Sequence, residues 1–101
     1  MKFKSENHRL HYKLWDWLSK NPKAKKEEWP GWGKYYALSK CFACEECGSY
    51  CAFCPIKWTK YYNHCENGES YYRWWWKSKG SPIDRMVYAM CVRDMEWEIK
   101  E

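Results

Sequence analysis

Six cysteines lie close together in the middle of the chain, at positions 41, 44, 47, 51, 54 and 65. Two Cys-x2-Cys pairs, Cys41/Cys44 and Cys51/Cys54, have the spacing at which a short turn brings two sulfur atoms onto one tetrahedral zinc ion. Only six residues separate the pairs, fewer than in most zinc ribbons. Cys54 with Cys65 is therefore an alternative second half of the site. The sequence predicts a zinc site whose ligands come from these five cysteines.

The same segment allows an iron–sulfur cluster. With Cys47 included, the first four cysteines match the Cys-x2-Cys-x2-Cys-x3-Cys spacing of bacterial ferredoxins. The proline expected directly after the fourth cysteine follows Cys54 instead of Cys51, and there is only one such run. These departures favour zinc over iron. Reduced cysteines without a metal are the third and least favoured interpretation.

The predicted zinc is structural, because four thiolates close its coordination shell, whereas a catalytic zinc keeps one position open. Other signs of catalysis are weak. His64 is next to Cys65 in sequence only, and the chain lacks a glycine-rich phosphate loop and the His-Glu-x-x-His motif. We therefore expect a protein that is not an enzyme and has no small-molecule substrate.

Aromatic residues are the second unusual feature, with nine Trp, nine Tyr and three Phe in 101 residues. Leu, Ile and Val are scarce by comparison, so most rings are expected in the core. A minority is expected to form an exposed patch, since Trp and Tyr dominate binding hot spots. The residues proposed for contact with a partner protein are Trp29, Trp32, Tyr35, Trp74, Trp75 and Trp76.

The positive charge gives an alternative function. The formal net charge is +5, and residues 1–40 carry ten Lys or Arg against four acidic residues. Basic side chains beside aromatic rings are typical of nucleic-acid binding, in which lysines contact phosphates and Trp29, Trp32 or Tyr35 stacks on bases. The lysines proposed for this role are Lys20, Lys23, Lys25, Lys26 and Lys34. An ordinary soluble helix carries surface lysines at a similar density.

The N-terminal part is predicted to be helical. Residues 5–20 have Ser5 as a plausible N-cap, and an apolar face is formed by Leu10, Leu14, Trp17 and Leu18. The spacing of His8 and His11 is weak evidence for a metal pair, and surface or half-buried histidines are favoured. After Asn21-Pro22, a short basic helix is expected over residues 23–29, ending at Pro30-Gly31.

The C-terminal part is also predicted to be helical. The ring-rich stretch over residues 68–79 has no decisive periodicity, and we favour helix over strand. Ser81-Pro82 is typical of a helix start, and the helix is expected to continue to about Glu98. Five of its residues form one stripe, with Cys91 as a buried core thiol. The stripe consists of Ile83, Met86, Val87, Met90 and Cys91.

These elements predict a mainly α, small single domain, with N- and C-terminal helices around a cysteine zinc-knuckle segment. Its parts are a basic helical part (1–40), a metal-binding segment (41–68), and an aromatic segment with the C-terminal helix (69–101). The longest purely apolar stretch, residues 86–92, is too short to cross a bilayer. We expect a cytoplasmic protein without membrane contact, where reducing conditions favour metal ligands over disulfides.

Several spaced motifs in residues 8–76 resemble small cysteine-containing proteins of phages and prophages of Firmicutes. The motifs are His-Arg-Leu-His-Tyr-Lys-Leu-Trp-Asp-Trp-Leu (8–18), Asn21-Pro22, Trp29-Pro30, Cys41-Phe-Ala-Cys44-Glu45, Cys54-Pro55-Ile56-Lys57-Trp58, Cys65 and Gly-x-x-x-Tyr (68–72). The resemblance implies importance for the cysteines at 41, 44, 51, 54 and 65, and Cys47 departs from the pattern. It implies no established activity.

A phage origin would favour a small accessory protein in the cytoplasm of an infected or lysogenic bacterium. By analogy, such proteins bind and inhibit or redirect a bacterial host protein, and anti-CRISPR and other anti-defence inhibitors are one such class. Nucleic-acid binding is the first alternative, and an iron–sulfur redox protein is the second.

Overall fold

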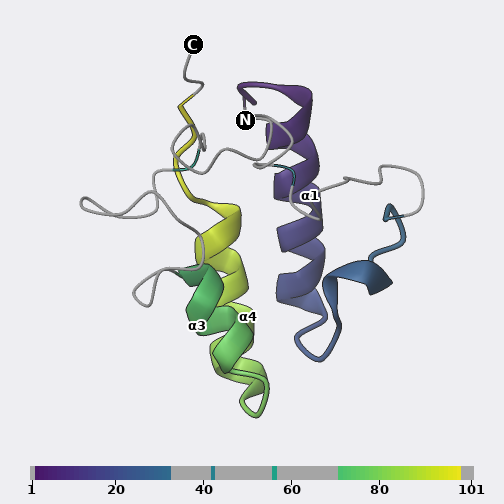
Figure 1. Cartoon of the computed structure of the whole chain (residues 1–101), viewed down its shortest axis with the longest axis vertical. Helices are drawn as coiled ribbons and strands as arrows, with labels where there is room; N and C mark the ends of the chain where they lie inside the picture. The colour runs from purple at the N-terminus through teal and green to yellow at the C-terminus, as the bar shows by residue number, and fades with distance from the viewer. Residues whose placement is uncertain (1, 33–41, 43–55, 57–70, 99–101) are drawn as a thin grey trace.

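Local capping sets both ends of the first helix. The computed structural model describes residues 2–32, 42, 56 and 71–98 (Figure 1). Helix α1 spans Glu6–Lys20, and the Ser5 hydroxyl accepts a hydrogen bond from the His8 backbone N–H at 3.1 Å, as the N-cap prediction requires. Asn21 ends the helix: its backbone N–H donates to Leu18 O, and its side-chain amide donates to Trp17 O at 2.8 Å. Asn21 therefore closes α1 and does not open a second helix.

The helix expected over residues 23–29 is reduced to one 3-10 turn, η1, at Lys26–Glu28. Lys25, directly before it, has extended backbone, with φ −93° and ψ 160°. The chain then turns at Trp29, whose indole lies against Gly31. A Cβ atom at position 31 would stand 2.6 Å from that ring, so only glycine allows this close approach. Burial of Trp29 thus takes precedence over the local helical preference.

The C-terminal part forms a helical hairpin of α3, Tyr71–Lys77, and α4, Pro82–Arg93. The prediction of helix for the ring-rich stretch is confirmed for these seven residues, and so is the start of α4 after Ser81. The predicted end near Glu98 is wrong, because the helix stops at Asp94. The chain then extends to Trp97, which pairs with Ile56 in an isolated antiparallel bridge.

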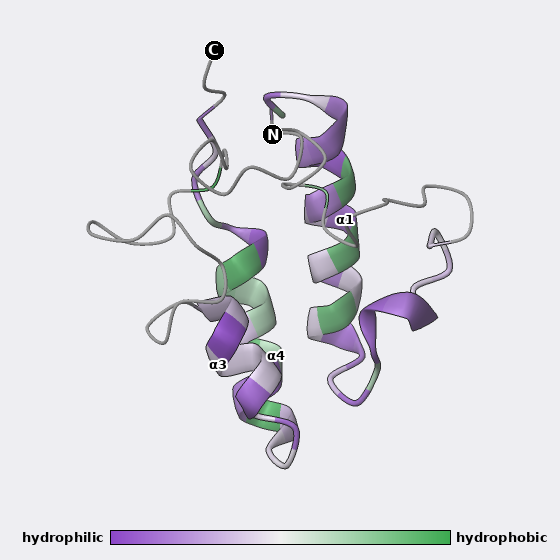
Figure 2. Cartoon of the chain, in the orientation of Figure 1, coloured by the Kyte–Doolittle hydropathy of each residue, from purple (hydrophilic) through white to green (hydrophobic). Residues whose placement is uncertain are grey.

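The hairpin packs beside α1, and α4 runs in the opposite direction to α1 (Figure 1). Hydrophobic segments alternate with hydrophilic ones along α1, consistent with one buried face (Figure 2). An ion pair between Arg93 and Asp16, at 2.9 Å, joins the two helices. One core cluster collects residues from α1, α3 and α4 together with others outside these helices: Leu10, Leu14, Trp15, Leu18, Trp29, Phe42, Ile56, Trp75, Ala89, Val92 and Trp97.

Helix α4 turns a different face inward from the one that the apolar stripe suggested. Its buried residues are Arg85, Ala89 and Val92. The stripe residues Ile83, Met86, Val87 and Met90 are exposed, with Ile83 at 71%. Cys91, expected in the core, is only half-buried. Ala89 is fully buried and has no bulk beyond Cβ, which allows α4 to approach the core closely on that side.

The described part of the chain is therefore mainly helical, as predicted. The predicted zinc-knuckle segment lies outside the described residues, apart from Phe42 and Ile56, which both reach the core. None of the helices in the described ranges is long and apolar enough to cross a membrane.

Candidate functional site

The predicted metal ligands, Cys41, Cys44, Cys51, Cys54 and Cys65, all lie outside the described residues, as do Tyr35 and Lys34. Within the described ranges, no group of three or more His, Cys, Asp or Glu side chains is placed to hold a metal ion. Cys91 belongs to α4, and partial burial, together with the nearby Asp94 carboxylate, raises the pKa of its thiol. Cys91 is therefore a weakly reactive thiol.

His8 and His11 are buried, which corrects the expectation of surface or half-buried histidines. The His8 ring stacks on Trp97 with centroids 4.6 Å apart, and the His11 ring meets the same indole edge-on at 5.2 Å. His8 Nδ1 accepts from the Lys4 backbone N–H at 2.9 Å. His11 Nε2 lies 2.9 Å from Val92 O, and since a carbonyl oxygen only accepts, Nε2 carries the proton. The pair is a structural contact between α1 and the residues after α4.

The pKa of His11 is lowered to about 4, mainly by burial. The hydrogen bond to Val92 O raises the pKa, and the charges of His8 and Lys26 lower it. The pKa of His8 is also lowered, first by burial and then by Lys4. Both rings are therefore neutral at pH 7.

The lysines proposed for nucleic-acid contact differ in their surroundings in the structure. Lys20 pairs with Asp16 at 3.0 Å, and the Lys26 ammonium donates to the Tyr72 hydroxyl at 3.3 Å. Lys23 and Lys25 are exposed. Trp29, one of the rings proposed to stack on bases, is buried edge-on against Phe42, with centroids 6.0 Å apart. Among the residues proposed for nucleic-acid contact, Trp29 is therefore closed to bases, and Lys20 and Lys26 already contact other side chains.

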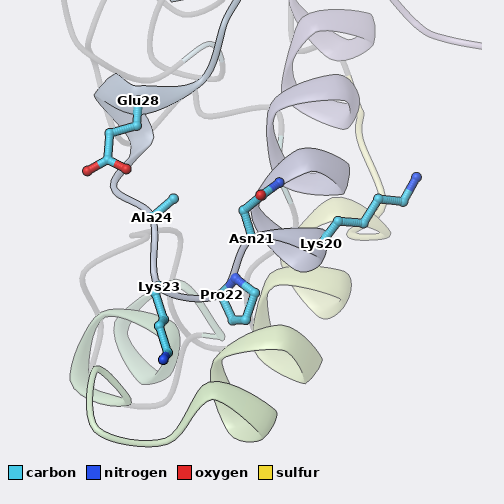
Figure 3. A pocket seen from close by; sticks show the side chains of 6 residues that line it. All are labelled: Lys20, Asn21, Pro22, Lys23, Ala24 and Glu28. Carbon is cyan, nitrogen blue, oxygen red and sulfur yellow. The ribbon is translucent and has the colours of Figure 1, made fainter.

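An open hollow of about 470 Å³ lies where α1 leads into η1. Its lining side chains point in different directions: the amines of Lys20 and Lys23 diverge, and the Glu28 carboxylate lies on the far side (Figure 3). A small-molecule site needs polar groups that converge on one position. This hollow therefore supports no substrate site.

Two of the rings proposed for partner contact belong to the core. Trp75 is 3% exposed and meets Trp15 edge-on at 4.8 Å, while the Arg85 guanidinium stacks 4.2 Å from the Trp75 ring centroid. Trp29 is buried as described above, and Trp32 is partly buried against the same core. Because their surfaces are already covered, Trp29 and Trp75 are left out of the candidate surface.

Three rings cluster on the hairpin, and we call them the aromatic surface: Tyr71 and Trp74, which are exposed, and Tyr88, which is partly buried against the core. Tyr71 and Trp74 are one helical turn apart on α3, with ring centroids at 5.7 Å. Tyr88 of α4 lies 6.5 Å from Tyr71 and 5.6 Å from Trp74. Trp76, a separate ring on α3, is 51% exposed, and the Lys79 ammonium lies 4.7 Å above it.

Sequence reasoning selected Trp74 and Trp76 but missed Tyr71 and Tyr88. The spacing of Tyr71 three residues before Trp74 was a usable signal, because residues three apart share one face of a helix. Tyr88 had no such signal, since its neighbours come from the other helix of the hairpin.

The chain was compared with protein-family models, with curated proteins and with solved structures, and none of the three comparisons gave a match. The functional argument therefore depends on the side chains themselves.

Proposed function

We propose that this protein is not an enzyme and acts by binding a bacterial host protein, through the aromatic surface and Trp76. The observation that carries the proposal is the exposure of Tyr71 and Trp74 on a hairpin whose neighbouring ring, Trp75, is almost fully buried. Large rings left at the surface of a small domain are typical of protein contact sites.

The arrangement of these rings also suits binding. Tyr71, Trp74 and Tyr88 contact one another across two helices, so their side chains are partly ordered before a partner arrives. Ordering a side chain on binding costs about 0.5–1.5 kcal/mol, and a prearranged cluster avoids part of that cost. The rings offer contact area together with hydroxyl and indole N–H groups for hydrogen bonds.

The proposal has a second part, a structural zinc ion held by four of Cys41, Cys44, Cys51, Cys54 and Cys65. The support is their spacing, described above. A zinc ion would stabilise the middle of a 101-residue chain, because metal-binding free energy adds directly to folding. The resemblance to phage proteins supports the third part, an accessory role in which the host protein is inhibited or redirected, as by an anti-CRISPR or other anti-defence inhibitor.

Affinity capture from a bacterial lysate, followed by binding measurements with the purified captured protein, tests the proposal. We expect Trp74→Ala to weaken the measured affinity at least 10-fold, as truncation of a central aromatic side chain at an interface does. Lys23→Ala with Lys25→Ala is the matched control, because both lysines are exposed and lie outside the hairpin.

The two sets of variants separate the alternatives. The nucleic-acid alternative predicts a different result: the lysine variant loses binding and Trp74→Ala does not. The captured ligand would then be nucleic acid, and its affinity would fall steeply with salt. If neither variant changes the affinity, the aromatic surface is not the binding site.

A further inference from the structure

We propose that the residues after α4 form a latch over the histidines of α1, and that this latch opens when His11 takes up a proton while α1, α3 and α4 stay folded. The latch comprises residues 94–98, and the side chain that joins it to the core is Trp97. It is a different part of the chain from the aromatic surface, so the inference does not depend on the proposed function.

One buried ring fastens the latch. Trp97 is 3% exposed: the His8 ring stacks on its indole with centroids 4.6 Å apart, and the His11 ring meets it edge-on at 5.2 Å. The backbone of Trp97 adds an isolated bridge to Ile56. The residues on either side of Trp97 are exposed, and this stretch runs on beyond the end of α4 (Figure 1). The latch can therefore leave the core without the unwinding of a helix.

His11 lies beneath the latch in a site that disfavours positive charge. Its ring is 2% exposed, and Nε2–H donates to Val92 O at 2.9 Å, so an added proton goes to Nδ1. Among the described residues, the charges that act on this ring are those of His8 on α1 and Lys26 on η1, and both lower its pKa. Protonation of His11 is therefore unfavourable while the ring is covered, and contact with water makes it favourable.

The acidic side chains of the latch respond in a lower pH range. Asp94 is ion-paired with Arg93 at 2.9 Å, and Glu96 and Glu98 are exposed. Ordinary carboxylates titrate near pH 4, whereas an ordinary histidine titrates near pH 6.5. A latch that opens between pH 7 and pH 5 therefore responds to histidine.

Displacing the latch is the smallest rearrangement that brings water to His11. Unfolding of α1 would also do so, but it would expose the core residues Leu10, Leu14 and Leu18 together. Opening of the latch exposes one large ring instead, and local openings need less free energy than global unfolding. Val92 belongs to α4, so its carbonyl stays beside His11 and accepts a stronger, charge-assisted hydrogen bond from the protonated ring.

His8 responds to acid differently from His11. Its Nδ1 accepts from the Lys4 backbone N–H, and a proton on Nδ1 would remove that acceptor. The His8 ring also stacks on the Trp97 indole, however, and a cation over an aromatic face is attracted to it. A charged His8 would therefore hold Trp97 in place. These contacts assign the trigger to His11.

The expected size of the response follows from the protonation of His11 in the closed and open forms. Its pKa is about 4 while the latch covers it, and it takes the ordinary value of about 6.5 once water reaches the ring. Lowering the pH from 7 to 5 should therefore raise the ratio of open to closed molecules about 20-fold.

Two buried indoles report the opening. Trp97 and Trp75 are both 3% exposed, and within the described residues neither indole N–H has an acceptor, so burial alone protects both from exchange with water. NMR measures the exchange of both N–H groups on the full-length chain, with Trp97→Phe and Trp75→Phe for assignment. Each rate, divided by that of free N-acetyltryptophanamide at the same pH, gives an opening constant.

The two indoles should behave differently. We expect the opening constant of Trp97 to rise about 20-fold between pH 7 and pH 5, and to exceed that of Trp75 at both pH values. Opening at Trp97 should also be insensitive to about 1 M urea, because a local opening exposes little surface, whereas opening at Trp75 should increase.

Two substitutions identify the trigger. His11→Gln retains an N–H donor for Val92 O but does not titrate, so the opening constant of Trp97 should be nearly the same at pH 7 and pH 5. His8→Gln removes the ring that stacks on Trp97, so it should raise the opening constant at both pH values and keep the roughly 20-fold response to pH. Helical circular dichroism checks that both variants are folded.

Three results would overturn the inference. The first is an equal opening constant with equal urea dependence for Trp97 and Trp75, which would show that Trp97 is exposed only by global unfolding. The second is an opening constant of Trp97 that is the same at pH 7 and pH 5 in the natural chain. The third is a pH response that His11→Gln keeps or His8→Gln abolishes, which would place the trigger elsewhere.

Discussion

The buried His11 makes the stability of the fold depend on pH. Its ring is 2% exposed, and its Nε2–H donates to Val92 O. Protonation of the other ring nitrogen would place a positive charge in this buried position, near His8 and Lys26, whose charges also lower the pKa of His11. Acidification is therefore expected to destabilise the fold at a pH at which most carboxylates are still ionised.

The direction and size of this pH effect follow from the pKa of His11 in the folded and in the unfolded chain. The pKa of His11 is about 4 in the folded chain, against about 6.5 in an unfolded one. The unfolded state therefore binds a proton first, and the contribution of His11 to stability is complete above pH 6.5 and is lost as the pH falls towards 4. At pH 5 protonation favours the unfolded state about 30-fold, which corresponds to about 2 kcal/mol.

Urea unfolding of the natural chain and of His11→Gln, at pH 7 and pH 5, measures this contribution. The glutamine amide retains an N–H donor for Val92 O but does not titrate in this range. Other titrating groups, including the cysteines, contribute to both proteins and cancel in the comparison. We expect the natural chain to lose about 2 kcal/mol more unfolding free energy between the two pH values than the variant loses.

His8→Gln is the matched control. The pKa of His8 is lowered by burial as well, but its ring is covered less completely than that of His11, so the effect of this substitution should be smaller. Equal losses in the natural chain and in His11→Gln would refute the reasoning, because they would show that His11 reaches solvent in the folded protein. Nitrogen chemical shifts of the His11 ring should also report a neutral ring protonated at Nε2.

Two further predictions concern the helix cap and the metal. Ser5→Ala should lower the free energy of unfolding by about 1 kcal/mol, because it removes the acceptor for the His8 N–H. Ser81→Ala should lower it by less, because the Ser81 side chain makes no capping hydrogen bond. Equal losses of stability in the two variants would contradict the capping argument. Elemental analysis of the purified chain should give about one zinc per molecule, and a strong chelator should lower the melting temperature. Iron with visible absorbance would indicate the iron–sulfur alternative instead, and a metal-free chain indifferent to chelator would contradict both.

The features that could be predicted from sequence are those that a few neighbouring residues determine. Ser5 caps α1 through a contact only three residues away, and Leu10, Leu14 and Leu18 share a face because of helical spacing alone. The start of α4 after Ser81 is local in the same way. Capping and periodicity act within one or two turns, so one sequence contains the necessary information.

The features that could not be predicted depend on residues distant in the chain. His8 and His11 are buried because Trp97 and Val92 lie over them, from more than 80 positions further on. The sequence has no local signal for that contact. In the same way, Trp74 and Trp75 are neighbours of the same type, and only the position of Trp15 determines that Trp75 enters the core.

The orientation of α4 shows why periodicity alone is insufficient for a helix that is apolar on two sides. Turning α4 about its axis would bury Ile83, Met86 and Val87, each worth roughly 1.5–3 kcal/mol when fully removed from water. The same rotation would separate Arg85 from the Trp75 ring and from Ala24 O, and would separate Val92 O from His11. The inward face of α4 is therefore the one that makes these polar contacts, and the apolar residues Ile83, Met86 and Val87 stay exposed.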